Sequence, residues 1–270
     1  RVKWALRLQY LLGRAAAVVT VPLIVCFIKL AGYRVRRLRA IRRQIDRLMR
    51  GHSGPWLICA NHLTMIDSVI LAYAMLPIHR SIFEYRRVPW NVPEHANFNR
   101  SVLVALMCYL VKCIPIKRGG DRASVKRSLD KCMHMLRRGQ NLMIFPEGTL
   151  SRTGRVNLDN CPYHVGRLVN TIPEARVMCI YLRGDRQKSY SNFPRFGETF
   201  TMTIKTLRPH TAMRGLRAQR DCARQIVGHL SKMEAAYFDS CGQRHRGSQN
   251  TRRPSQKHRR AVYAPGIDPR

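Results

Sequence analysis

Acidic residues are scarce in this chain of 270 residues. It holds 15 Asp and Glu against 49 Lys and Arg, which gives a formal net charge of +34. A field of this sign excludes basic partners but fits nucleic acid, anionic lipid headgroups, acidic carrier proteins and phosphorylated substrates alike. The charge therefore does not choose among these partners, and the choice has to come from local motifs.

Closely spaced cysteine pairs are absent as well. The nine cysteines are scattered, and none forms a C-x-x-C pair. This pattern argues against a disulfide framework and predicts free thiols in a reducing compartment. Ligand spacing typical of zinc is missing, so we expect no structural metal. The chain also lacks a G-x-S-x-G serine, which argues against a hydrolase-type nucleophile.

An uncharged run is present near the start, where residues 15–28 read AAAVVTVPLIVCFI. As a helix this run spans about 21 Å, which is short of the ~30 Å hydrocarbon core of a bilayer. Snorkelling by Arg14 and Lys29 would lengthen it, and Pro22 is expected to kink it. A buried soluble helix and a secretory signal are alternatives, although no small-residue cleavage site stands near Gly32. We expect membrane attachment through this segment, spanning or re-entrant.

The next segment is strongly basic, with eight arginines between positions 34 and 50 and one acidic residue, Asp46. Apolar residues recur there at helical spacing, at Leu38, Ile41, Ile45 and Leu48. The pattern predicts a basic amphipathic helix lying on an anionic membrane surface, while an ordinary solvated helix is the alternative. The arginine excess places this side of the membrane in the cytoplasm.

The middle of the chain alternates short apolar runs with longer amphipathic ones. We expect strands at 55–60, 81–85, 114–117, 141–145, 176–182 and 199–207. We expect helices at 65–76, 101–113, 121–139 and 212–238. The alternation predicts an α/β fold whose mostly parallel sheet is flanked by helices, preceded by the membrane-associated helical segment.

The chain divides into three parts on this basis. Residues 1–50 form the membrane-associated part, and residues 51–239 form the α/β domain. Residues 240–270 are polar, basic and without periodicity, so we expect a disordered tail.

The stretch CANHLTMIDS, residues 59–68, places a histidine after an apolar run and an aspartate five positions later. Residues five apart on an ideal helix point about 140° apart, so this pair cannot meet within one helix. His62 and Asp67 can meet if His62 lies in the turn after a strand and Asp67 in the first turn of a helix. The T-x-x-D pattern starting at Thr64 favours such a helix start. A loop histidine beside a simple helix cap remains the alternative.

Two further blocks suit the binding of anions. FPEGT, residues 145–149, follows a predicted strand, and in an α/β sheet the carboxyl ends of the strands hold ligands. Gly148 permits close backbone approach to an anion, and Thr149 offers a hydroxyl. IPIKRGG, residues 114–120, carries Lys117 and Arg118, and the planar fork of arginine suits a phosphate. Each block alone also fits a plain turn.

Together, the blocks NHLTMID, IPIKR and FPEGT resemble the glycerolipid acyltransferase family in order and spacing, over roughly residues 50–210. The type member of that family makes phosphatidic acid from lysophosphatidic acid. The resemblance implies a catalytic pair formed by His62 and Asp67. It also implies that Arg118 contacts the acceptor's phosphate. The substrate-binding residues that it implies are Lys117, Arg118, Glu147, Gly148 and Thr149.

The implied reaction moves an acyl chain from acyl-CoA or acyl carrier protein to the hydroxyl of a lysophospholipid, by default 1-acyl-glycerol-3-phosphate. His62 would be the general base and Asp67 would orient it. We expect no metal and no bound cofactor. The expected partners are anionic membrane lipids and the acyl donor, and we expect no binding of nucleic acid. We expect the protein at the cytoplasmic face of a bacterial inner membrane.

Three alternatives stay open at this point. The acceptor could be glycerol-3-phosphate, another lysophospholipid or an amino-acid lipid. The basic chain could instead bind nucleic acid, or it could be an inactive membrane scaffold that keeps the fold.

Overall fold

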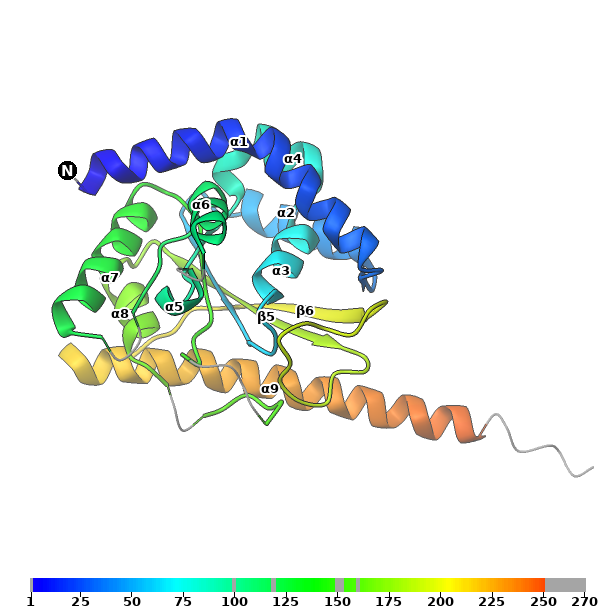
Figure 1. Ribbon diagram of the computed structural model, residues 1–270. Coiled ribbons are helices and arrows are strands. Elements are labelled where there is room, and N and C mark those ends of the chain that lie inside the picture. The colour runs from blue at the N-terminus through cyan, green and yellow to red at the C-terminus, as the bar shows by residue number, and fades with distance from the viewer. Residues whose placement is uncertain (1, 99–100, 118–119, 149–152, 159–160, 251–270) are drawn as a thin grey trace, which may run out of the picture. The chain divides into compact units, whose positions relative to one another are not determined.

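The computed structural model describes residues 2–98, 101–117, 120–148, 153–158 and 161–250 (Figure 1). The chain separates into two compact units, Arg1–Glu234 and Ala235–Arg270. The first unit holds the sheet and every residue discussed below as part of a site. Within the described part of the second unit, the chain continues as helix.

A six-stranded sheet forms the centre of the first unit, in the order β1-β6-β5-β2-β4-β3. Its strands are β1 (Arg34–Val35), β2 (Trp56–Ala60), β3 (Trp90–Asn91), β4 (Leu142–Ile144), β5 (Arg176–Gly184) and β6 (Thr199–Leu207). All neighbours run parallel except β5 and β6, which are antiparallel. The expected α/β fold with a mostly parallel sheet is therefore confirmed.

Helices flank this sheet on both sides (Figure 1). The helices are α1 (Val2–Leu30), α2 (Leu38–Arg50), α3 (Asp67–Met75), α4 (Ile78–Phe83), α5 (His95–Phe98), α6 (Val102–Leu110), α7 (Arg122–Arg137), α8 (His164–Thr171) and α9 (Gly215–Asn250). A short 3-10 helix, η1, covers Tyr85–Arg87. The four helices expected between residues 65 and 238 are all present, as α3, α6, α7 and α9.

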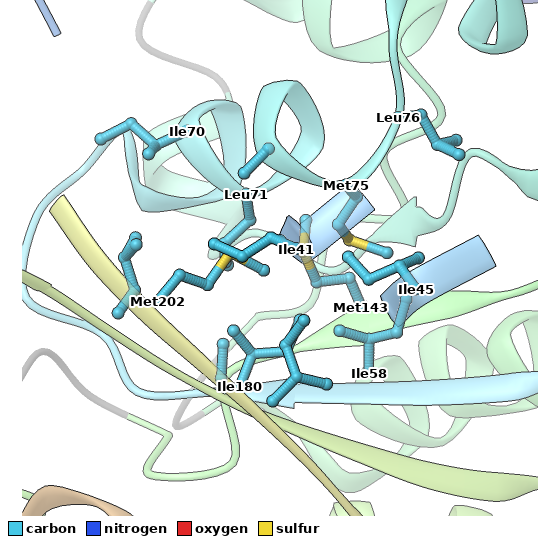
Figure 2. Close-up of a cluster of buried hydrophobic side chains, with 14 of the residues drawn as sticks. Ile41, Ile45, Ile58, Ile70, Leu71, Met75, Leu76, Met143, Ile180 and Met202 are labelled. Carbon is cyan, nitrogen blue, oxygen red and sulfur yellow. The ribbon is translucent and has the colours of Figure 1, made fainter. Parts of the chain in front are cut away.

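A core of buried apolar side chains joins α2 and α3 to one face of the sheet (Figure 2). Ile41 and Ile45 of α2 meet Leu71 of α3 above Ile58 and Ile180 of the strands. Burying each such side chain stabilises the fold by about 1.5–3 kcal/mol. The apolar face of α2 is thus occupied by the protein core, and the expectation that this face lies on a membrane is wrong. A core helix and a surface-bound helix share the same amphipathic period, so the pattern did not separate them.

Asp46, the one acid of that basic segment, is also used by the fold. Its carboxylate pairs with Arg50 of the same helix at 3.1 Å, with Arg87 at 2.9 Å and with Arg80. These pairs join α2 to α4 and η1. A single carboxylate therefore pairs with one arginine of its own helix and with two arginines that lie more than 30 residues further along the chain.

Helix α1 is continuous over 29 residues and packs against α3, α4 and α6. Gln9 anchors it, since its buried amide donates to the carbonyls of Tyr109 (3.0 Å) and Cys113 (2.9 Å). Gly13 allows close approach, because a Cβ there would lie 2.5 Å from the carbonyl oxygen of Leu110. Among the described residues, α1 is the helix with the length and composition to cross a membrane. One of its faces is thus used by the domain.

Three other expectations need correction. Residues 81–85 are not a strand, because α4 runs to Phe83 and η1 begins at Tyr85. Residues 114–117 form no named strand, and Ile116 makes only an isolated bridge to Glu94. The tail is helical rather than disordered from 240 to 250, since α9 ends at Asn250, and residues 251–270 lie outside the described residues.

Candidate functional site

The loop after β2 carries His62, and its neighbour Asn61 fixes how the chain leaves the strand. The buried Asn61 amide donates to the carbonyl of Leu182 at 2.9 Å and accepts from its N–H at 2.7 Å. These two hydrogen bonds replace a pair of backbone hydrogen bonds, so the Asn61 side chain extends the β2–β5 pairing beyond the end of β2. The carbonyl of Leu63 accepts from Ser191 N at 3.2 Å, which ties the other side of the loop. His62 therefore starts from a rigid position at the carboxyl end of the sheet.

The structure brings His62 and Asp67 together. Nδ1 of His62 lies 3.2 Å from Oδ2 of Asp67, and both side chains are largely buried. Asp67 is the first residue of α3, while His62 stands in the turn before it. This is the arrangement that the spacing requires, because the bend between strand and helix replaces a regular helical turn.

Hydrogen bonds from the same loop hold the Asp67 carboxylate. Oδ2 accepts from the backbone N–H of Leu63 at 2.6 Å and of Thr64 at 2.8 Å. Oδ1 accepts from the Thr64 hydroxyl at 2.5 Å. The carboxylate therefore holds the loop that precedes α3 and faces the imidazole at the same time. The N-cap residue of α3 is Ile66, and it makes no side-chain cap hydrogen bond.

Phe145 lies flat against the His62 ring, with centroids 4.0 Å apart and planes 15° apart. The cause is the sheet register. β2 and β4 are parallel neighbours that pair Cys59 with Ile144, so the residues just beyond them come side by side. Stacking on Phe145 and the bond to Asp67 together leave the imidazole little freedom to turn.

Glu147 lies under the same loop and is almost fully buried. Its Oε1 accepts from the backbone N–H of His62 at 3.3 Å, and its Oε2 accepts from that of Asn157 at 3.2 Å. The residue therefore holds the His62 backbone and a second loop in place.

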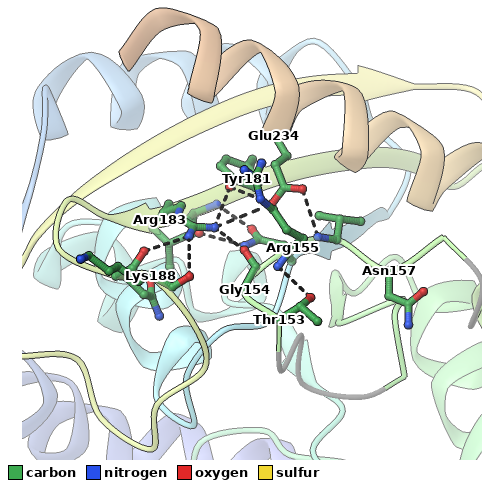
Figure 3. A network of polar contacts seen from close by, with 12 residues as sticks. Thr153, Gly154, Arg155, Asn157, Tyr181, Arg183, Lys188 and Glu234 are labelled. Carbon is green, nitrogen blue, oxygen red and sulfur yellow. Dashed lines mark hydrogen bonds and ion pairs between the residues drawn. The ribbon is translucent and has the colours of Figure 1, made fainter. Parts of the chain in front are cut away.

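That second loop, residues 153–157, is also held from the far side (Figure 3). Arg183 of β5 donates from Nη1 to the carbonyl of Gly154 and lies 3.8 Å from Oε1 of Glu234. Oε2 of Glu234 accepts from the N–H of Val156 at 3.1 Å. A buried ion pair thus clamps the loop that Asn157 connects to Glu147.

A sequence model described as acyltransferase matches residues 33–212. The matched part contains the whole sheet together with His62, Asp67, Phe145 and Glu147. The chain belongs to the acyltransferase family. A search of curated proteins found no significant match.

The acyltransferase site opens into a cavity of about 480 Å³. His62 and Phe145 form one wall, α3 contributes Val69 and Ala72, and α1 contributes Ile24. Most of the other lining residues are apolar as well. Such a cavity has the chemistry of a hydrocarbon-binding site.

The expected substrate-binding residues lie in different environments. Glu147 faces the backbone of His62 in the loop after β2, and Lys117 is exposed. Gly148 has a positive φ of 69°, and a Cβ there would lie 2.5 Å from Cγ of Pro162. The turn therefore requires a glycine at this position. Arg118 and Thr149 lie outside the described residues.

Sequence reasoning assigned no role to Phe145, Asn61 or the 153–157 loop. Phe145 stood inside the FPEGT block, and its position after a strand next to β2 was the available signal. No comparable signal marks the clamp of Arg183 and Glu234, which are far apart in sequence. Among the described residues, no three His, Cys, Asp or Glu side chains gather as metal ligands.

Proposed function

We propose that this acyltransferase moves a fatty acyl chain from acyl-CoA or acyl carrier protein to the free hydroxyl of 1-acyl-glycerol-3-phosphate, giving phosphatidic acid. One observation carries the proposal. An imidazole oriented by a buried carboxylate lines an apolar cavity of about 480 Å³. A base beside a hydrocarbon site is what acyl transfer to an alcohol requires.

His62 is the general base in the proposed mechanism. Asp67 holds Nδ1, so the acceptor hydroxyl approaches the other ring nitrogen, Nε2. Nε2 takes the proton as the hydroxyl oxygen bonds to the thioester carbonyl carbon. The carbon–sulfur bond then breaks, and the thiolate takes the proton back from the imidazolium. Asp67 stabilises the positive charge that His62 carries between the two steps.

The cavity would hold the acyl chain of the thioester during this reaction. Phe145 contacts both the His62 ring and the cavity, so it marks where the chain ends and the reacting carbonyl begins. Helix α1 closes the cavity with Thr20, Val21, Ile24 and Val25. The chain would therefore lie between α1 and the domain, close to where a membrane lipid can enter.

The acceptor's phosphate would bind at Arg118, as the family resemblance implies, and the block of Glu147, Gly148 and Thr149 would help to bind the acceptor. The glycerol hydroxyl would then point to His62. Glu147 acts on the backbone in this proposal and does not touch the phosphate, since two like charges repel.

The exposed face of α1 supports the proposal of membrane association. Its outer face exposes Trp4, Leu8, Leu11, Val18, Val19, Leu23 and Phe27. We propose that this face enters a lipid surface while the opposite face stays on the domain, at the cytoplasmic side of a bacterial inner membrane.

The test is a panel of donors and acceptors. Purified protein receives labelled acyl-CoA or acyl carrier protein together with lysophosphatidic acid, glycerol-3-phosphate, lysophosphatidylcholine or an amino-acid lipid that has a free hydroxyl, and the lipid products are separated. We expect diacyl product with lysophosphatidic acid above all. Transfer to another acceptor at a higher rate would replace the proposed substrate, and no transfer with any pair would overturn the proposal.

A further inference from the structure

A second cavity, of about 470 Å³, lies where the start of α1 meets η1 and the end of α7. It shares no lining residue with the cavity at His62. Its walls are formed by Lys3, Trp4, Leu6, Arg7, Tyr10, Arg86, His134, Met135, Arg138 and Gln140. Nothing in the proposed acyl transfer uses this cavity.

Four of those residues are cationic, namely Lys3, Arg7, Arg86 and Arg138, and the described lining contains no carboxylate. One contact stiffens the wall, because Nη2 of Arg86 donates to the carbonyl of Arg138 at 3.1 Å. Burial, with the positive charges of Arg138, Lys3 and Arg137, lowers the pKa of His134. All four cations are exposed, and with no acid among them they give this space a positive field that attracts an anion.

A buried lysine separates this cavity from the one at His62. Nζ of Lys112 donates to Oε1 of Gln140, which lines the basic cavity, at 3.2 Å. It also donates to the carbonyl of Tyr85, which lines the apolar cavity, at 3.2 Å. The rings of Tyr10, Tyr85 and Trp90 surround it at 4.8–5.5 Å. The two cavities are therefore distinct sites with a built wall between them.

The surroundings of the basic cavity indicate a lipid as the source of the anion. Trp4 is 72% exposed at its edge, and the exposed apolar face of α1 continues from there with Leu8 and Leu11. A tryptophan and basic residues at the end of an apolar helix are typical of the membrane–water interface. A phosphate seated in the cavity would thus leave its acyl chains beside the apolar face of α1.

We infer that the basic cavity binds the phosphate of an anionic membrane lipid and so fixes the start of α1 at the lipid surface. The arginine forks would hold the phosphate oxygens, and Trp4 would contact the glycerol region. This site is independent of the acceptor site, so the protein would need an anionic lipid in addition to its substrate.

Trp4 also provides the readout. The chain has three tryptophans, and Trp56 and Trp90 are buried, so a change in emission at the surface reports on Trp4. The probe is dihexanoyl phosphatidylglycerol below its micelle concentration, which is neither the substrate nor the product of the proposed reaction. Dihexanoyl phosphatidylcholine and inorganic phosphate are the parallel probes.

The full chain is titrated as wild type, as Arg7→Gln/Arg138→Gln and as the control Arg214→Gln/Arg217→Gln, which removes two exposed charges elsewhere. We expect saturable binding of phosphatidylglycerol, weakened about tenfold or more by the cavity variant and little changed by the control. Equal weakening in both variants would show a general charge effect and overturn the site. If inorganic phosphate binds as tightly as phosphatidylglycerol, the site binds a soluble anion, and the proposal of a lipid ligand is wrong. If phosphatidylcholine binds as tightly, the negative charge of the lipid does not determine binding, and the proposal is wrong as well.

Discussion

At the scale of single residues, the two oxygens of Asp67 have different tasks. Oδ2 faces Nδ1 of His62 and two backbone N–H groups, while Oδ1 accepts from the Thr64 hydroxyl. Each of these partners is a donor or, in the case of Nδ1, can be one. A carboxylate satisfies all of them, and a group that itself donates would not.

Asp67→Asn should therefore lower kcat by about 10²–10⁴-fold, because the amide places N–H groups against donors and loses the charge that orients His62. The KM for the acyl donor should change little, since the acyl cavity is untouched. Steady-state kinetics check this, with Asp185→Asn as the control, because Asp185 pairs with Arg36 at the surface. An unchanged kcat in Asp67→Asn would leave the residue only the structural role of holding the loop before α3.

Sequence patterns predicted this pair because both residues lie in one short segment. Their meeting depends only on where β2 ends and α3 begins, and both boundaries carry local signals. Phe145 and Glu147 depend instead on the pairing of β2 with β4, which joins positions some 85 apart in the chain. No local pattern states which strands become neighbours.

At the scale of the elements, helix α1 is held to the domain by few polar contacts and by close packing at Gly13. The hydrogen bonds of the Gln9 amide and the close contact of Gly13 with the Leu110 carbonyl fix the position of α1 along its axis and its rotation about that axis. The same helix closes the cavity at His62, so its position bears on activity as well as on stability.

Gly13→Leu should destabilise the domain by about 1–3 kcal/mol, because the new side chain has no room against α6 and Tyr85. Thermal unfolding in detergent measures this, and activity should fall with it. Ala15→Leu is the control, since Ala15 is exposed on the same helix. Equal melting temperatures for Gly13→Leu and wild type would show that α1 is not docked on the domain.

Element types with strong periodicity were predicted correctly, as α7, β5 and β6 show. The errors came where two environments share one pattern. The apolar face of α2 fits a membrane or a core, and only the position of the sheet beneath it decides. Residues 81–85 are apolar enough for a strand, but they continue a helix that starts at Ile78.

For the whole molecule, four histidines contribute to how stability responds to mild acid. Burial is the first cause that lowers the pKa of His52, His134, His164 and His229. In the folded state these side chains therefore prefer the neutral form, whereas the unfolded chain protonates them below about pH 6.5. The unfolded state then binds more protons, so stability falls as the pH drops below that value.

The melting temperature should accordingly decrease from pH 7 to pH 5.5, and the decrease should be smaller in His164→Gln. His164 is chosen because burial and the nearby Arg167 both lower its pKa. Melting curves at a series of pH values test this. A melting temperature that rises on acidification would contradict the sign of the shifts.

The net charge of +34 gives a second prediction at this scale, which also addresses the nucleic-acid alternative. Vesicles with anionic lipid should retain the protein partly even at high salt, because the apolar face of α1 adds a contact that salt does not screen. Duplex DNA should release it fully. Sedimentation at increasing salt compares the two, and tight DNA binding without affinity for vesicles would favour the alternative.

The central claim is that His62 removes the proton from the acceptor hydroxyl, and one rate comparison tests it most directly. His62→Ala is compared with His79→Ala, an exposed histidine outside the cavity, in transfer from labelled thioester to lysophosphatidic acid. We expect His62→Ala to lose about 10²–10⁴-fold in rate and His79→Ala to match wild type. Equal rates for His62→Ala and wild type would contradict the account.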